Sequence, residues 1–330
     1  MARKAEALRL PLLTVFWLAI FTIALHAQQD SCLYRTLAVN VVTDDGKPVE
    51  GLSAQNFQGK LHGRALGIES AARDSGPRRI VLVLDVSGSM DVFRGIEILA
   101  ARRFLRADPR SSAALITFSS QVDDKIDFAK GRGMISDKLA GLETPVNIRG
   151  LRRTALRDAL DAALDLLRPV QFGDAIFLVS DGDDNASQMN RRDFTAHLLD
   201  AGARLFAFVP VSELSRFRPA DDKVEDGVEW VRQLVTASGG DFASNTLDGD
   251  LVSMTTLKRE GTCLTNSGQK IVSFATVGFA HEIDEPYRLT VRLPGELPKP
   301  HEWELRALDA NGKVNNNWRV VYPQRLAACP

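Results

Sequence analysis

The period of the hydrophobic positions changes twice along the chain and divides it into segments. Residues 33–42 alternate between apolar and polar positions, with Leu37 and Val41 on one face, as in a half-buried β-strand. A continuous apolar run follows at residues 80–84, which is typical of a central parallel strand covered on both faces. We therefore expect a new domain to begin at about residue 77.

Beyond this run, short buried strands alternate with amphipathic helical patterns. Helices are predicted where apolar residues recur every three or four positions, and strands where short apolar runs separate them. The predicted strands are residues 80–84, 113–118, 121–128, 175–179 and 204–209, and the predicted helices are residues 91–106, 156–167, 191–201, 226–237 and 247–258. This alternation predicts an α/β fold with right-handed crossovers and a doubly wound sheet.

The alternating period returns in the last part of the chain. Apolar and polar residues alternate at 288–293 and 302–306, and Asn311-Gly312 marks a turn between two such runs, which predicts antiparallel strands. A few strands alone bury too little apolar surface, so we expect a small β-sandwich that the N-terminal strand joins. The expected units are an N-terminal β segment and linker at 28–76, an α/β domain at 77–262 and a C-terminal β domain at 263–330.

Residues 1–27 have the composition of a secretory signal peptide. Basic residues at 3, 4 and 9 precede an uncharged run at 10–25, and Ala27 lies at the expected cleavage site. The run is shorter than the roughly 20 apolar residues of a membrane-spanning helix, although an uncleaved N-terminal anchor is the alternative. We expect no membrane span after cleavage, and a protein that is secreted or kept in the periplasm or cell envelope.

Composition and charge narrow the classes of partner. Hydrophobic residues make up 45% and charged residues 25% of the 330, which is ordinary for a folded soluble protein. The 41 Lys and Arg nearly balance the 42 Asp and Glu, and a net charge of −1 gives no general attraction to nucleic acid. Binding must then depend on a local site.

The chain contains three cysteines, Cys32, Cys263 and Cys329. An exported protein meets oxidising conditions in which one pair can close as a disulfide, leaving one thiol over. The sequence alone does not select the pair.

Two of the predicted buried strands are followed by oxygen-bearing side chains. Asp-Val-Ser-Gly-Ser follows the first strand at 85–89, Ser-Asp-Gly follows another at 180–182, and a threonine precedes the helix between them. Open α/β sheets bind ligands at the carboxyl ends of their strands, where these residues would lie. Five side chains are expected to meet there: Asp85, Ser87, Ser89, Thr154 and Asp181.

A ligand set that contains only oxygen selects a hard cation. Five such side chains with added waters suit the octahedral coordination of Mg²⁺, with Mn²⁺ and Ca²⁺ as alternatives. Two carboxylates at most neutralise a divalent ion, and hydroxyls add no negative charge, so the metal keeps affinity for an outside carboxylate. We therefore predict a site that docks an Asp or Glu of a protein partner.

At these five positions the chain resembles the von Willebrand factor type A (VWFA) domain. The metal-ion-dependent adhesion site (MIDAS) of that family has the pattern D-x-S-x-S, then a Thr, then an Asp, and every position is filled here. The resemblance covers about residues 79–258 and implies a Rossmann-like fold, a noncatalytic adhesion or scaffold role, and a metal that binds an acidic residue of a protein ligand. Arg152 and Arg153 stand where the family usually has small residues, so we expect them to alter the preferred charge of the ligand or to narrow access to the metal.

The segment before the α/β domain carries a second resemblance. Val-Val-Thr-Asp-Asp-Gly-Lys-Pro-Val at 41–49, with Gly-Leu-Ser at 51–53 and Phe57, looks like the lead-in of secreted VWFA-related proteins of acidobacteria. No function is carried over from that group.

Other interpretations of the same residues are an enzyme and a purely structural protein. An aspartyl phosphatase-like hydrolase with Asp85 as nucleophile would need a second Asp two residues later, where Ser87 stands. A serine hydrolase would need a G-x-S-x-G frame with a His partner, and His62, His197, His281 and His301 are spread out without metal-ligand spacing. The sequence also allows a purely structural envelope scaffold whose site holds a metal but binds no partner.

A calcium loop is the remaining alternative. Asp181, Asp183 and Asn185 imitate the start of such a loop, but Ala186 occupies the position of its glycine and Arg192 that of its glutamate. We therefore predict no calcium loop at this position.

Overall fold

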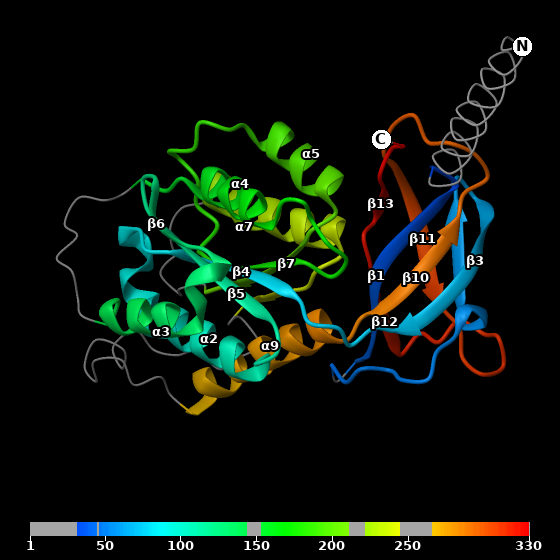
Figure 1. The fold of residues 1–330 in the computed structure, drawn as a ribbon, viewed down its shortest axis with the longest axis horizontal. Coiled ribbons are helices and arrows are strands. Elements are labelled where there is room, and N and C mark those ends of the chain that lie inside the picture. The colour runs from blue at the N-terminus through cyan, green and yellow to red at the C-terminus, as the bar shows by residue number, and fades with distance from the viewer. Residues whose placement is uncertain (1–31, 45, 144–152, 211–221, 245–265, 330) are drawn as a thin grey trace, which may run out of the picture.

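The computed structural model describes residues 32–44, 46–143, 153–210, 222–244 and 266–329 (Figure 1). In this part of the chain, one sheet of six strands carries the helices, and a second sheet of seven strands lies beside it (Figure 1). The predicted α/β architecture is confirmed, with a mixed sheet at its centre.

The six-stranded sheet has the order β6-β5-β4-β7-β8-β9. Only β6 is antiparallel to its neighbour, and the other pairs are parallel. Every residue of β7 and β8 is buried, which explains why these strands read as continuous apolar runs. The strands are β4 (Arg79–Asp85), β5 (Ser112–Phe118), β6 (Val122–Ile126), β7 (Ala175–Val179), β8 (Arg204–Val209) and β9 (Phe242–Ser244).

Helices cover both faces of this sheet, because successive strand residues point to opposite sides. Leu82 and Leu84 of β4 pack with α2 (Arg94–Ala107), α3 (Gly131–Gly141) and α9 (Asn266–Asp284). Val81 and Val83 pack instead with α4 (Leu156–Leu167), α5 (Arg191–Ala201) and α7 (Asp222–Ser238). None of the helices in the described ranges is long and apolar enough to cross a membrane.

Helix α9 corrects the predicted boundary at residue 263. The segment expected to begin the β domain is helical, and its Val272, Phe279 and Ile283 are buried in the same cluster as α2. Its glycines and β-branched residues have weak helix propensity, so packing against the sheet outweighs the local preference. The change from α/β to β structure therefore comes after Asp284, while the helix predicted at 247–258 falls outside the described residues.

The second sheet combines strands from both ends of the chain, in the order β12-β1-β10-β3-β2-β11-β13 with antiparallel neighbours. The N-terminal strand β1 lies between β10 and β12, so it joins the C-terminal strands. The strands are β1 (Tyr34–Thr43), β2 (Phe57–Leu61), β3 (Arg64–Arg73), β10 (Tyr287–Arg292), β11 (His301–Ala307), β12 (Trp318–Val321) and β13 (Arg325–Leu326). Short 3₁₀ helices complete the described elements: η1 (Ala54–Asn56), η2 (Gly88–Phe93) and η3 (Phe128–Lys130).

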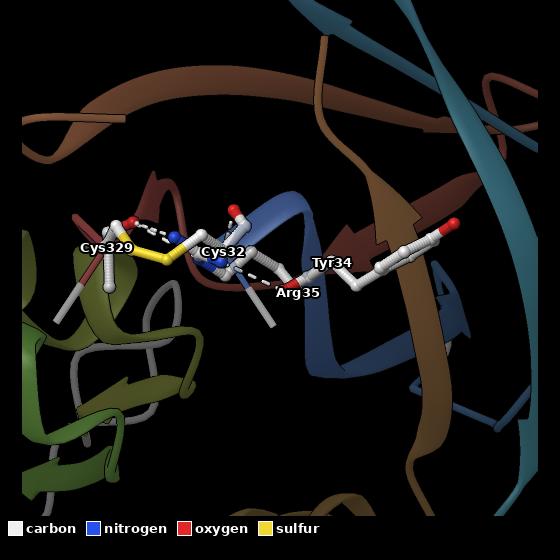
Figure 2. The surroundings of a disulfide bond; sticks show 5 residues. Cys32, Tyr34, Arg35 and Cys329 are labelled. Atoms are coloured by element: carbon white, nitrogen blue, oxygen red, sulfur yellow. Dashed lines mark hydrogen bonds between the residues drawn. A yellow bond between two sulfur atoms is a disulfide. The ribbon is translucent and has the colours of Figure 1, made fainter. Parts of the chain in front are cut away.

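A disulfide joins the segment before β1 to the segment after β13 in the seven-stranded sheet. Cys32, just before β1, is bonded to Cys329, and their Cα atoms lie 5.2 Å apart (Figure 2). Next to the bond, Arg35 donates hydrogen bonds to the carbonyl of Cys32 (3.0 Å) and to that of Ala327 (3.3 Å). The structure thus selects a pairing that the sequence left open, while Cys263 falls in a range that is not described.

Candidate metal centre

The first part of the candidate site is the turn that leaves β4. Asp85 ends the strand with a fully buried carboxylate, whose Oδ1 accepts a hydrogen bond from the backbone N–H of Ser87 (3.0 Å). Ser87 immediately precedes η2, and the hydroxyl oxygens of Ser87 and Ser89 lie 3.1 Å apart. Ser87 is buried and Ser89 is exposed, so this hydroxyl pair extends from the sheet edge to the surface.

The second part is the turn that leaves β7, the parallel neighbour of β4. The Ser180 hydroxyl donates a hydrogen bond to Oδ2 of Asp85 (2.7 Å), which links the two turns directly. Asp181 follows with a half-buried side chain. Gly182 then takes the left-handed conformation (φ +85°) and passes so close to α7 that a Cβ on Gly227 would lie 2.4 Å from the Gly182 carbonyl oxygen.

Thr154 is held beside these turns by its backbone. Its N–H donates to Oδ1 of Asn185 (2.9 Å), and its carbonyl accepts hydrogen bonds from the N–H groups of Asn185 (3.0 Å) and Ala186 (2.9 Å). The next residue, Ala155, donates its N–H to the carbonyl of Ser119, just after β5 (2.7 Å). Thr154 is therefore fixed, buried, where the loops after β5 and β7 meet.

Asn185 is a residue whose role sequence reasoning missed. We considered it only as part of a calcium loop that we rejected, yet its side chain and backbone hold Thr154 in place. The neighbouring Asp184 is also used structurally, because its Oδ2 accepts hydrogen bonds from the Arg157 N–H (2.8 Å) and the Ser187 hydroxyl (2.9 Å). The contacts of Asn185 with Thr154 and of Asp184 with Arg157 join residues 31 and 27 positions apart, and local sequence patterns do not indicate such contacts.

The electrostatics of the site are dominated by two carboxylates. Burial raises the pKa of Asp85 to about 7, and the nearby charge of Asp181 raises it as well, against hydrogen bonds from Ser87 and Ser180 that lower it. A divalent cation between the two turns would relieve this repulsion. The donor set of carboxylates and hydroxyls therefore fits a hard cation such as Mg²⁺.

Histidine and cysteine ligands do not contribute to this site. In the described ranges, no group of three or more His, Cys, Asp or Glu side chains is placed to hold a metal, so a cation would depend on the hydroxyls as well. Two histidines that are far apart in the sequence lie close together, since the β2–β11 pairing brings the rings of His62 and His301 to 4.8 Å between centroids. His197 lies elsewhere, with its Nδ1 3.2 Å from Oδ1 of Asp161.

The surroundings of the site include one of the two predicted basic residues. Arg153 is exposed directly before Thr154, whereas Arg152 is outside the described residues. An exposed guanidinium beside the cation site would favour an acidic ligand over a basic one.

Comparison with known proteins gives a family match over the part of the chain that carries the site. Residues 80–183 match the von Willebrand factor type A domain, and this range includes all five predicted ligands. No curated protein matches the chain in sequence.

Several solved structures are similar to part of the chain. An aerotolerance-related membrane protein from Bacteroides fragilis NCTC 9343 is 12% identical, with a TM-score of 0.37, over 56% of this chain and 98% of that one. The protein BatB from Bacteroides thetaiotaomicron is 14% identical, with a TM-score of 0.35, over 56% and 95%. The human COPII-coat protein Sec24c is 11% identical, with a TM-score of 0.38, over 77% of this chain and 44% of its own.

Proposed function

We propose that the von Willebrand factor type A domain at residues 80–183, a type of domain that binds protein partners, binds its partner through a divalent cation. The proposed ligands are Asp85, Ser87, Ser89, Thr154 and Asp181. The observation that carries the proposal is the approach of two carboxylates at the edge of the sheet. Their repulsion contributes to the raised pKa of Asp85, and the Ser87–Ser89 hydroxyl pair lies in the adjoining turn.

The proposed ligands differ in how deeply they are buried. Asp85 is fully buried and both of its oxygens accept hydrogen bonds, so the orientation of its carboxylate is fixed by Ser87 and Ser180. Ser89 is exposed and Asp181 half-buried, so these side chains are nearest to an incoming partner. When bound, Mg²⁺ would supply a charge of +2, which the two carboxylates of the site neutralise without making the site negative. The ion would therefore still accept a carboxylate of the partner. Mn²⁺ or Ca²⁺ would serve in the same way.

A noncatalytic role is favoured over a phosphatase-like one. A nucleophilic aspartate needs a free oxygen that faces the substrate. Asp85 has one hydrogen bond on each oxygen, which leaves lone pairs for a cation, but it has no exposed surface from which to attack a substrate. The position two residues later, where the acid-base carboxylate of such enzymes is expected, is a serine.

Export to an oxidising compartment is also part of the proposal. The bond between Cys32 and Cys329 supports it, because disulfides persist in secreted and periplasmic proteins and are rare in the cytosol. The pattern of residues 1–27 supports the same location, in the cell envelope or outside it.

A capture experiment tests the proposed function. The purified protein is immobilised and incubated with an envelope extract of its own host in Mg²⁺, and bound protein is then eluted with EDTA. Wild type should release a partner on chelation, and Asp181→Asn should capture little of it. Asp123→Asn, which changes an exposed carboxylate elsewhere on the same domain, should behave as wild type.

The outcomes separate the alternatives. Equal recovery with and without chelator, and in Asp181→Asn, would contradict metal-dependent binding and favour the structural scaffold. Magnesium-dependent hydrolysis of p-nitrophenyl phosphate that disappears in Asp85→Asn would favour the enzyme instead.

A further inference from the structure

A buried acidic residue lies near the turn of residues 85–89, called here the metal-binding turn because it carries Asp85, Ser87 and Ser89. The proposed function does not use this acidic residue. Glu97 of α2 has no exposed surface, and its Oε2 accepts a hydrogen bond from Nη1 of Arg94 at 2.7 Å. Its other oxygen, Oε1, has no hydrogen-bond partner in the described structure. Burying a carboxyl group with half of its hydrogen bonds unmade is costly, so the pair needs an explanation beyond packing.

Arg94 connects this carboxyl group to the metal-binding turn. Its Nη2 donates to the carbonyl of Val86 (3.1 Å), and its Nη1 also lies within hydrogen-bonding distance of the carbonyl of Asp85 (3.4 Å). A weaker contact joins Nη2 to Oδ1 of Asp91 (3.4 Å). Because Arg94 begins α2 directly after η2, its guanidinium reaches back to the backbone carbonyls of Asp85 and Val86, where the turn begins.

The turn is therefore held from two sides. The N–H of Val86 donates to the carbonyl of Phe118 in β5 (2.8 Å), while the carbonyl of Val86 accepts from Arg94. With both its N–H and its carbonyl fixed, this peptide segment determines the direction of the side chains of Asp85 and Ser87 on either side. Groups that orient ligands in this way commonly change metal affinity by about 10- to 100-fold when removed.

We infer that Arg94 and Glu97 form a positioning pair for the cation site, in which Glu97 fixes Arg94 and Arg94 fixes the turn that carries Asp85, Ser87 and Ser89. The inference rests on the proposed binding of a cation by that turn. Neither residue is a ligand, and the pair acts only through the backbone of residues 85–86.

Electrostatics and positioning predict opposite changes in Mn²⁺ affinity for Arg94→Gln, so the two causes can be told apart. Arg94→Gln removes a positive charge next to the site, which by Coulomb's law alone would tighten cation binding. If Arg94 positions the turn, Mn²⁺ affinity should instead fall by about 10-fold or more. Glu97→Gln keeps an oxygen acceptor for Arg94, so affinity should stay within about 3-fold of wild type.

The experiment is a calorimetric Mn²⁺ titration of the full chain, with the melting temperature in EDTA measured separately. Arg79→Gln is the matched control, because Arg79 also donates to two backbone carbonyls, of Leu167 and Pro169 (2.7 Å each), and to the buried Asp174. Arg79 lies at the other end of β4, so its loss should lower the melting temperature and leave Mn²⁺ affinity unchanged.

The results that would overturn the inference are distinct from those that would overturn the proposed function. Wild type that binds no Mn²⁺ refutes the cation site and the positioning role together. Wild type that binds, with Arg94→Gln binding as tightly or more tightly, refutes the positioning role alone. If Arg94→Gln does not fold, Arg94→Lys decides, since a lysine keeps the charge but not the two-pronged contact, and unchanged affinity would again refute it.

Discussion

The two ends of strand β4 carry charged residues in opposite situations. At the amino end, Arg79 pairs with the buried Asp174 (Nη2 to Oδ2, 2.5 Å). At the carboxyl end, Asp85 lies near the like-charged Asp181, and in the described structure no Arg or Lys side chain forms an ion pair with either. One end satisfies its charges and contributes to stability, whereas the other holds two like charges close together, which costs stability and is typical of binding sites.

The amino end also joins the two sheets. Arg204, at the start of β8, is buried and donates to Oδ1 of Asn40 in β1 (2.9 Å) and to the carbonyl of Ile283 in α9 (3.2 Å). Burial lowers the pKa of Arg204 to about 9, and the charge of Glu282 partly opposes this. This edge of the sheet thus joins the two sheets, and the opposite edge carries the turns with the proposed ligands.

Breaking the amino-end pair should have the largest effect on stability. Asp174→Asn removes the charge that faces Arg79, and loss of one partner of such a pair costs about 2–4 kcal/mol of unfolding free energy once partial exposure is considered. Urea unfolding measures this loss. Mn²⁺ affinity should not change, and a weakened site would contradict the division between the two ends.

Crowding the carboxyl end should disturb both stability and binding. In Gly227→Ala, the new methyl group would lie 2.4 Å from the Gly182 carbonyl oxygen, so the turn that carries Asp181 must shift. We expect a loss of about 1–3 kcal/mol in unfolding free energy, with weaker Mn²⁺ binding. Gly133→Ala on the exposed face of α3, which has open space around it, is the control and should stabilise slightly or have no effect. Full Mn²⁺ affinity in Gly227→Ala would show that the turn tolerates displacement.

Removing the like-charge repulsion should stabilise the metal-free protein. Asp181→Asn eliminates the charge that raises the pKa of Asp85, so in EDTA the unfolding free energy should rise by about 1 kcal/mol, or about 2–4 °C in melting temperature. Adding Mn²⁺ should raise the melting temperature of wild type but not of the variant. A destabilised variant in EDTA would mean that Asp181 is a structural residue and not one held for binding.

A further effect concerns the pH dependence of stability at the amino end. Burial and the charge of Asp241 raise the pKa of Glu282 to about 8, so the folded state holds a proton that the unfolded state releases near pH 4.5. The stability that this group contributes is complete below about pH 4.5 and is lost as the pH rises through 8. Glu282→Gln cannot ionise, so its advantage over wild type should grow from pH 5 to pH 8. Urea unfolding across that range checks it, and a constant difference would contradict it.

The same comparison shows what the sequence could predict. The strands β4 and β7 were predictable because parallel strands buried on both faces are continuous in apolar residues, and their ends are marked by Asp85 and Asp181. The family pattern then predicted that the hydroxyls of Ser87, Ser89 and Thr154 accompany these carboxylates. These features are local, so a sequence displays them directly.

The contacts that hold the site in place were not predictable in the same way. Asn185 meets Thr154 across 31 positions of the chain, and nothing in the sequence near either residue indicates the other. Arg94 and Glu97 look like an ordinary helix-surface pair at three-residue spacing until the packing of α2 shows that Glu97 is buried. Helix α9 was missed because its residues favour a helix only when packed on the sheet.

The central claim, that side chains from separate strands and a helix start hold one divalent cation, is tested most directly at Thr154. Calorimetric titration with Mn²⁺ at pH 8, above the pKa of about 7 of Asp85, compares wild type with Thr154→Ser and Thr154→Val. We predict one Mn²⁺ per chain in wild type, similar binding in Thr154→Ser, and at least about 10-fold weaker binding in Thr154→Val, which keeps the shape but loses the hydroxyl. Wild type that binds no Mn²⁺, or Thr154→Val that binds it as tightly as Thr154→Ser, would contradict the account.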